Sequence, residues 1–131
     1  MLAIVILVGG KGTRVAYLTK GKSKAEINIW GEKKIIDFQI SSLAKIKKKI
    51  ILLSKKKFKS LSQYILKKYR SLDIDIIEED QQLGTAGCLE VLKKYKHTDF
   101  LVVNGDLIFN FNFDELIKFH YKKKSDCSLV V

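Results

Sequence analysis

The apolar run from Leu2 to Val8 (LAIVILV) is followed at once by Gly9 to Arg14 (GGKGTR). An unbroken apolar stretch rich in β-branched residues is typical of a strand buried on both faces of a parallel sheet. The glycines after it stop the strand and let backbone N–H groups approach a phosphate closely. Residues 2–14 therefore predict that the chain opens with a central strand whose carboxyl end carries a loop suited to an anion.

Beyond this opening, apolar runs alternate with segments of helical periodicity. Helices are expected over residues 33–47, from Phe58 to Tyr69, from a Thr85 cap to Tyr95, and from Asp114 onward. Further strands are expected at residues 25–30, 49–54, 74–77, 100–103 and 127–131. The alternation predicts an α/β fold, namely a Rossmann-like, mostly parallel sheet with helices on both faces. Residues 127–131 would form an edge strand with no element after it, so the sheet is expected to be incomplete at its C-terminal end.

Length and composition indicate one domain over residues 1–131. The chain is 47% hydrophobic and 30% charged, which suits a single domain with a buried core. Its longest apolar run is far shorter than the ~20 residues of a membrane span, and no basic residue precedes that run as in a secretory signal. Two cysteines are too few for a disulfide framework. These features predict a cytoplasmic protein that does not enter a membrane.

Positive charge is concentrated in the first half of the chain. Residues 1–60 carry 15 Lys+Arg against three acidic residues, a net charge of +12. Such a surface favours polyanions: nucleic acid, a membrane surface or a phosphorylated small molecule. Nucleic acid is disfavoured because the sequence lacks a helix-turn-helix, RNA-recognition aromatics and zinc spacing. The lysine runs at 47–49 and 55–57 are more simply interpreted as solvated faces, so the charge alone does not select among these partners.

Two common phosphate motifs do not fit. The pattern G-x-G-x-x-G, counted from Gly10, fails at Val15, and no helical periodicity opens directly after the glycines. The segment Gly21-Lys22-Ser23 imitates the end of a P-loop, but Ala16 stands at the position of its first glycine. The sequence therefore predicts neither a dinucleotide fingerprint nor a P-loop.

Polar and glycine residues concentrate in three loops, at residues 9–24, 79–87 and 104–106. In parallel α/β sheets, ligands bind in the crevice beyond the carboxyl ends of the strands. Each of these loops follows a predicted strand, so we expect all three to converge on one crevice.

The motifs in these loops resemble those of a known family. GGKGTR at 9–14, a lysine ten residues past the arginine, LGTAG at 83–87 and VVNGD at 102–106 occur in this order. Together they resemble the sugar-1-phosphate nucleotidyltransferases, over the N-terminal, nucleotide-binding half of such enzymes. The sequence looks most similar to heptose- and mannose-1-phosphate guanylyltransferases.

The resemblance implies a reaction and a set of site residues. In the family, an oxygen of a sugar 1-phosphate attacks the α-phosphorus of a nucleoside triphosphate with the help of Mg²⁺, and pyrophosphate leaves. Arg14 would hold the leaving phosphates, Lys24 would meet the α-phosphate, and Asp106 would bind Mg²⁺. On its own, Asp106 would be interpreted as a turn or helix-capping residue. The nucleotide-binding residues would be Gly9, Gly10, Lys11, Gly12, Thr13, Glu79, Gly84 and Thr85.

Glu79 favours GTP among the nucleoside triphosphates. By resemblance, a side chain five residues before the first glycine of LGTAG pairs with the base. Guanine presents N1–H and N2–H₂ side by side, and a carboxylate can accept from both. The alternative is that Glu79 is a solvated acid at a strand end.

The sequence also departs from the family in ways that bear on activity. No proline flanks Lys24, so its loop is expected to be less constrained, and Glu26 stands where an apolar residue is common. The family's sugar-binding portion and second metal carboxylate would lie beyond residue 131. The chain could thus be an N-terminal fragment, one part of a split enzyme with a separate C-terminal half, or a decayed relic. A homo-oligomer and a catalytically inactive or regulatory nucleotide-binding module are further alternatives.

Overall fold

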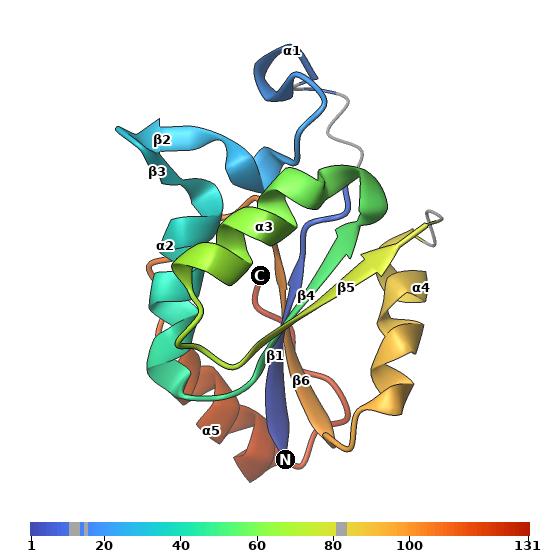
Figure 1. Ribbon diagram of the computed structural model, residues 1–131. Helices are drawn as coiled ribbons and strands as arrows, with labels where there is room; N and C mark the ends of the chain where they lie inside the picture. Colours follow the sequence, from blue (N-terminus) through green and yellow to red (C-terminus); the bar gives the residue numbers. More distant parts are fainter. Residues whose placement is uncertain (11–13, 15, 81–83) are drawn as a thin grey trace.

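The computed structural model describes residues 1–10, 14, 16–80 and 84–131. Within them, a four-stranded sheet has the order β5-β4-β1-β6 (Figure 1). Its strands are β1 (Leu2–Leu7), β4 (Ile50–Lys55), β5 (Ile74–Glu79) and β6 (Asp99–Asn104). Every neighbouring pair is parallel. The structure therefore confirms the α/β fold with a parallel sheet and a central first strand.

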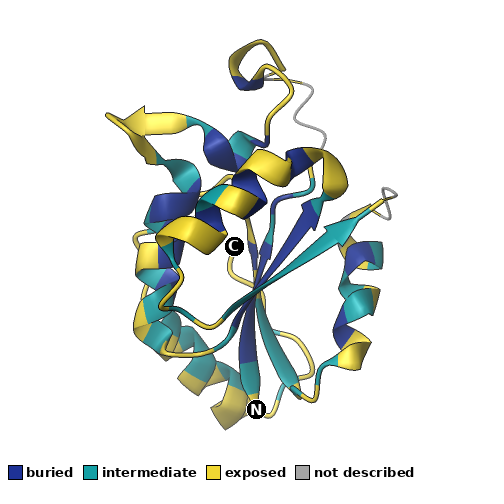
Figure 2. Ribbon diagram, in the orientation of Figure 1, coloured by how far each residue is buried: buried dark blue, intermediate teal, exposed yellow. Residues whose placement is uncertain are grey.

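β1 occupies the centre because its side chains are apolar in both directions. Ile4 pairs with Ile50 of β4 and with Leu101 of β6. Ile4 and Ile6 belong to the core on one face of the sheet, and Ala3 and Val5 to the core on the other. Only a strand covered on both faces buries all four, and Figure 2 shows β1 dark blue between the flanking layers.

Helices cover both faces because parallel strands need long crossover connections. On one face lie α2 (Ile35–Leu43) and α3 (Lys59–Lys68), whose apolar side chains pack on β1 and β4. On the other lies α4 (Gly84–Gly87), which continues into the 3-10 helix η5 (Cys88–Lys94). Figure 1 shows α2 and α4 on opposite sides of the sheet. The first face holds the larger core.

Several expected elements differ in detail. Residues 25–30 are not one strand: the 3-10 helix η2 (Lys24–Glu26) comes first, and β2 (Asn28–Trp30) then pairs antiparallel with β3 (Lys33–Lys34). The helix expected over 33–47 divides into α2 and the 3-10 helix η3 (Ala44–Ile46). The 3-10 helix η4 (Lys56–Phe58) precedes α3, and a short helix, α1 (Ala16–Thr19), lies in the expected loop.

The last helix, α5 (Phe113–Lys123), begins after Asn112, whose side chain accepts a hydrogen bond from the Glu115 N–H. The strand expected at 127–131 is wrong, because these residues form no ladder. The Ser128 hydroxyl instead lies 2.9 Å from His120 Nδ1 of α5. Among the described residues, no helix has the length and apolar character needed to cross a membrane.

Candidate functional site

A cavity lies at the switch point of the sheet, where successive strands are added first on one side of β1 and then on the other. From β1 the chain adds β4 and β5 on one side, and β6 is then added on the other side of β1. Ligands of open parallel sheets bind at such a switch point. The cavity here has a volume of about 310 Å³, and its lining includes Gly9, Gly10, Lys24, Glu79, Gly84 and Asn104 to Asp106. The predicted convergence of the three loops is confirmed.

The loop after β1 contributes backbone to this cavity. Val8 is buried, and its N–H donates to the Leu53 carbonyl at 2.9 Å, which continues the sheet up to the loop. Gly9 and Gly10 then line the cavity. Three of the predicted nucleotide-binding residues, Lys11, Gly12 and Thr13, lie outside the described residues. Arg14 is exposed and is not among the residues that line the cavity.

Lys24 projects from a turn that is tied to the end of β1. The Ser23 hydroxyl donates to the Val8 carbonyl at 3.1 Å and accepts from the Ala25 N–H at 3.3 Å. The Glu26 carboxylate accepts from the Ser23 N–H at 3.2 Å, which completes a capping box around η2. Ser23 and Glu26 are both buried. The turn next to Lys24 is therefore fixed by hydrogen bonds.

Glu26 extends this constraint to the neighbouring helix. Its Oε1 accepts a hydrogen bond from the Ser60 hydroxyl of α3 at 2.9 Å. Proline would have restricted the loop through φ alone, whereas here a buried carboxylate joins the turn to a helix. The expectation of a loosely held Lys24 loop is therefore not met, because polar contacts take the place of proline.

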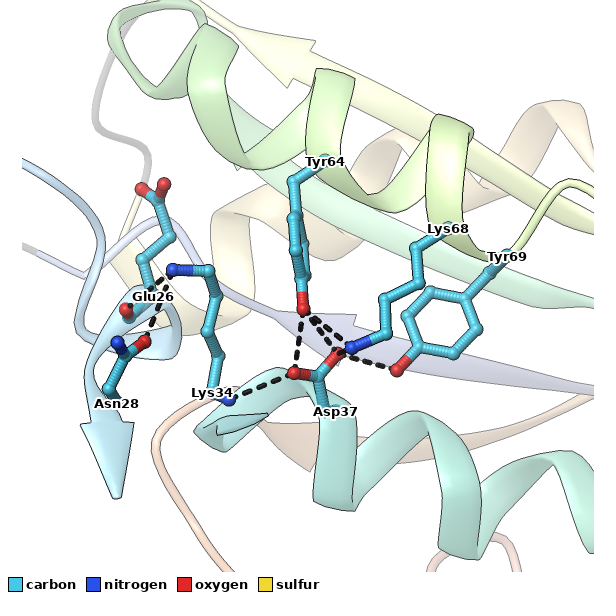
Figure 3. A network of polar contacts seen from close by, with 7 residues as sticks. All are labelled: Glu26, Asn28, Lys34, Asp37, Tyr64, Lys68 and Tyr69. Carbon is cyan, nitrogen blue, oxygen red and sulfur yellow. Dashed lines mark hydrogen bonds and ion pairs between the residues drawn. The ribbon is translucent and has the colours of Figure 1, made fainter. Parts of the chain in front are cut away.

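A network of polar contacts connects Glu26, at the end of the lysine turn, to α2 and α3 (Figure 3). The Lys34 Nζ donates to the Glu26 carbonyl at 3.4 Å and to Asn28 Oδ1 at 3.3 Å. The Lys34 N–H donates to Asp37 Oδ2 at 2.8 Å, at the start of α2. Lys34 therefore links the lysine turn to the carboxylate of Asp37.

Asp37 is the centre of that network. Its buried carboxylate accepts hydrogen bonds from the Tyr64 hydroxyl at 2.7 Å and the Tyr69 hydroxyl at 2.5 Å, and it pairs with Lys68 at 3.1 Å. Burial alone would raise the pKa of Asp37, but the hydrogen bonds from Tyr69, the Lys34 N–H and Tyr64 outweigh it and lower the pKa below its ordinary value. Burial and the same carboxylate raise the pKa of Tyr69. The network joins α2 to α3 and keeps Asp37 ionised.

Asp106 sits in a loop pressed against the end of β1. The Gly105 N–H donates to the Leu7 carbonyl at 2.7 Å. A Cβ at Gly105 would lie 2.6 Å from that same carbonyl oxygen and closer still to the Val8 side chain, so only glycine fits here. This approach brings Asp106 Oδ2 to 3.2 Å from Lys24 Nζ. The structure thus brings together the two charged residues predicted from distant motifs.

The opposite side of the cavity is formed by the ends of β4 and β5. Glu79 ends β5 in register with Lys55 of β4, and both line the cavity. The Glu79 Oε1 is buried and has no hydrogen-bond partner among the described residues. Gly84 has a φ of 73°, which favours glycine, where α4 begins. The side chain of Thr85 lies outside what the structure describes.

Asp106 is a reasonable ligand for Mg²⁺ only together with a phosphorylated ligand. In the described part of the chain, no group of three or more His, Cys, Asp and Glu residues is placed to hold a metal ion. Mg²⁺ commonly uses one or two carboxylates together with waters and substrate phosphates. A single, partly exposed carboxylate at the mouth of a cavity fits that mode of binding.

Sequence reasoning missed the residues that hold these charged groups in place. Gly105 was part of a motif, but its close contact with β1 was not foreseen. Ser23 belongs to the lysine segment and to the incomplete P-loop pattern, and neither pattern predicts its hydrogen bond to the Val8 carbonyl. Gln39, a fully buried residue of α2, donates to two carbonyls of the Asp106 loop. Its signal was present: it falls on the apolar face of the helix, three residues after Ile36 and four before Leu43.

Comparison with known proteins identifies relatives of the whole chain. A sequence profile described as nucleotidyl transferase matches residues 3–131. A mannose-1-phosphate guanyltransferase from Yarrowia lipolytica is 35% identical over 132 residues, covering 96% of this chain and 36% of the relative. A glucose-1-phosphate adenylyltransferase from Rhodopirellula baltica is 27% identical over 143 residues, covering 95% of this chain and 32% of the relative.

Solved structures agree with this fold. A Bacillus anthracis protein assigned as a glucose-1-phosphate thymidylyltransferase superposes with a TM-score of 0.78 at 19% identity, covering 95% of this chain and 52% of that one. The chain thus spans about a third of the length of these curated relatives and about half of the solved chain. The relatives differ in the nucleotide that their names give, so the base has to be argued from the residues of this chain.

Proposed function

The chain belongs to the nucleotidyl transferase family, as the motif resemblance to sugar-1-phosphate nucleotidyltransferases predicted, and on that premise we propose that it works in guanylyl transfer. The reaction joins GTP and a sugar 1-phosphate into a nucleotide sugar and releases pyrophosphate. The chain spans about a third of the length of the curated relatives, so the activity of the whole enzyme is part of this proposal. We expect the reaction in the cytoplasm.

One observation carries the proposal: Lys24 and Asp106, 3.2 Å apart, meet at the cavity lined by Gly9 and Gly10. Catalysis of phosphoryl and nucleotidyl transfer consists largely of positioning and of neutralising negative charge. Backbone N–H groups, a cation and a metal carboxylate are the groups needed for that task.

Each group has a defined role in the proposed reaction. A phosphate oxygen of the sugar 1-phosphate forms a bond to the α-phosphorus of GTP, and the bond to the oxygen bridging the α- and β-phosphates breaks. Lys24 would neutralise charge on the α-phosphate, and Arg14 on the leaving pyrophosphate. Asp106 would hold Mg²⁺, which neutralises phosphate charge when bound. Lys24 and Asp106 are 32% and 41% exposed, so both can turn toward a ligand.

The guanine preference rests on Glu79. Its buried Oε1 lacks a partner among the described residues, and an unpaired buried carboxylate oxygen is costly unless a ligand donates to it. Guanine offers two adjacent N–H donors, whereas uracil and thymine offer one ring N–H between carbonyl groups. The lining position of Glu79 supports a base contact over the alternative of a solvated strand-end acid.

Two measurements on the wild-type chain test the proposal. Mg·GTP and Mg·UTP are titrated into the protein, and pyrophosphate release from GTP is assayed with mannose 1-phosphate and with heptose 1-phosphate. We expect tighter binding of Mg·GTP and release with one of the sugars. Failure to bind either nucleotide would refute the proposal.

A second candidate is a nucleotide-binding module without turnover. It is favoured by the cavity itself, because the predicted site residues that line it are all ones that the resemblance assigns to the nucleotide or its metal ion: Gly9, Gly10, Lys24, Glu79, Gly84 and Asp106. The same titration separates the two: saturable binding of Mg·GTP with no pyrophosphate release from any sugar 1-phosphate supports the module. Retention on heparin that depends on salt and is unaffected by GTP would instead support nucleic-acid binding by the basic half.

A further inference from the structure

We propose that Gln39 is a positioning residue for Asp106, holding the loop that presents this carboxylate to a metal-bound nucleotide. The inference rests on the proposed function, because it assumes that Asp106 meets Mg·GTP. It concerns a residue of α2 that lies outside all the motifs described above and that does not itself line the cavity.

The contacts of Gln39 are made to the backbone on both sides of Asp106. Its side-chain Nε2 donates to the Asn104 carbonyl at 2.7 Å and to the Leu107 carbonyl at 2.7 Å. Both distances lie at the short end of the range for N–H···O hydrogen bonds. One amide group thus holds the first and last residues of the four-residue segment that contains Asp106.

The orientation of this amide is determined by its partners. Carbonyl oxygens only accept hydrogen bonds, so the nitrogen of Gln39 must face them. Its oxygen is left buried with no partner within the described part of the chain. A buried, unpaired oxygen is unfavourable, and violations of this kind are expected where a function requires them.

The apolar surroundings of Gln39 argue against a role in core packing alone. Its neighbours on the buried face of α2, Ile36, Ile40 and Leu43, are fully buried and apolar. An apolar residue at position 39 would complete that face without an unpaired oxygen. The glutamine is therefore explained by what its two donors do for the loop.

The loop is held from two directions at once. Gln39 fixes the carbonyls of Asn104 and Leu107 from the side of α2, and the Leu7 carbonyl fixes the Gly105 N–H from the end of β1. Asp106 is thereby presented to Lys24 on a backbone with little freedom. Displacing a group by about 1 Å can reduce a rate by about 10², so a loose loop would weaken the contribution of Asp106.

The test removes the donors while keeping the volume. Gln39→Met has no side-chain N–H, and Gln39→Leu serves as a second variant if the first does not fold. Ile40→Val is the matched control, because it shortens the adjacent fully buried residue of the same helix and makes no polar contact with the loop. All three are examined well below their unfolding temperatures.

Two readouts are taken, and the first does not depend on a nucleotide. Amide hydrogen exchange is measured for residues 105–108, where we expect faster exchange in Gln39→Met than in the wild type or in Ile40→Val. The affinity for GTP is then measured with Mg²⁺ and with EDTA. We expect Gln39→Met to weaken Mg·GTP binding by about tenfold, the effect of one or two lost hydrogen bonds, with the affinity in EDTA unchanged.

The outcomes separate this inference from the proposed function. Unchanged exchange in the loop overturns it, as does faster exchange with unchanged Mg·GTP affinity, which would make Gln39 a structural brace only. Equal weakening with Mg²⁺ and with EDTA would also overturn it, because the effect would not pass through Asp106. If the wild type binds no nucleotide while the loop exchanges faster in the variant, the proposed function fails and the positioning role with it.

Discussion

The two sides of the cavity differ in how their polar groups are satisfied. On the β1/β6 side, Lys24 and Asp106 pair with each other, and the backbone that carries them is held by Ser23 and Gly105. On the β4/β5 side, Glu79 keeps a buried oxygen without a partner among the described residues. Among the described side chains that line the cavity, Lys24 and Asp106 satisfy each other, whereas Glu79 has a hydrogen-bond acceptor to offer to a ligand.

This difference corresponds to two tasks. Charge neutralisation in a transition state requires groups that are already in place, because rearranging them during the reaction costs free energy. Selection of a base requires a polar group that only the correct ligand satisfies. The β1/β6 side therefore suits the phosphate chemistry and the β4/β5 side the choice of nucleotide.

The largest effect is expected on the β1/β6 side from Lys24→Met. Pyrophosphate release should fall by about 10² to 10³, the usual effect of removing one group that stabilises developing charge. The free energy of unfolding should change by less than about 1 kcal/mol, since the ion pair with Asp106 is partly exposed. Lys22→Met, in the same loop and exposed, is the control. Equal rates of pyrophosphate release in the two variants would show that Lys24 has no role in the reaction.

Asp37→Ala tests the polar network that joins the lysine turn to α2 and α3 on the β1/β6 side. The change leaves the hydroxyls of Tyr64 and Tyr69 and the Lys34 N–H without their acceptor, so we expect a loss of about 2 to 4 kcal/mol in the free energy of unfolding. Urea denaturation at pH 7 measures it. Asp73→Ala, at an exposed ion pair with Lys49, should cost under about 1 kcal/mol.

The same carboxylate predicts how stability depends on pH. The folded protein lowers the pKa of Asp37, so its contribution is present above the ordinary pKa of about 3.9 and is lost as the pH falls through the lower folded value. The difference in unfolding free energy between the wild type and Asp37→Ala should therefore shrink below about pH 4. A difference that stays constant from pH 7 to pH 3 would show that folding does not lower the pKa of Asp37.

Glu79→Gln addresses the β4/β5 side. An amide offers one acceptor and one donor, so it cannot accept from both guanine N–H groups. We expect Mg·GTP affinity to fall about tenfold, and the ratio of GTP to UTP affinity to fall with it. The control is Glu78→Gln. Glu78 precedes Glu79, and its carboxylate accepts a hydrogen bond from the Ser62 hydroxyl of α3. An unchanged ratio of GTP to UTP affinity would show that Glu79 does not contact the base and is a solvated acid at a strand end.

The smallest effect is expected from Ser60→Ala. The variant removes one hydrogen bond to Glu26 while the capping box remains, so the free energy of unfolding should fall by about 1 kcal/mol. Chemical denaturation measures this, with exposed Ser71→Ala as the control. A loss no greater than that of Ser71→Ala would show that α3 does not help to hold the lysine turn.

Sequence patterns predicted the sheet because its strands are strongly apolar. The run from Leu2 to Val8 could only be a central strand, and the loop residues followed from their places at strand ends. Residues 127–131 misled because their apolar pattern shows strand propensity but not whether a partner edge is available. In the structure, the side chain of Ser128 in that tail shares a hydrogen bond with His120 of α5.

The supporting contacts of the site were much harder to foresee. Lys24 and Asp106 were identified from motifs, but nothing local indicates that Glu26 reaches Ser60 or that Gln39 reaches the loop 65 residues away. Such contacts depend on helix packing, which a single sequence does not specify. Gln39, a polar residue on the apolar face of α2, is the feature of the sequence that indicates such a contact.

The most direct test of the central claim is an NMR titration of the ¹⁵N-labelled wild-type chain with Mg·GTP. We predict saturable shifts of the backbone amides at Gly9, Gly10, Lys24, Glu79 and Asp106, with weaker changes for Mg·UTP at the same concentrations. Shifts confined to the basic segment Lys45–Lys49, or no saturable shift at the cavity, would contradict a nucleotide site at the ends of β1, β5 and β6.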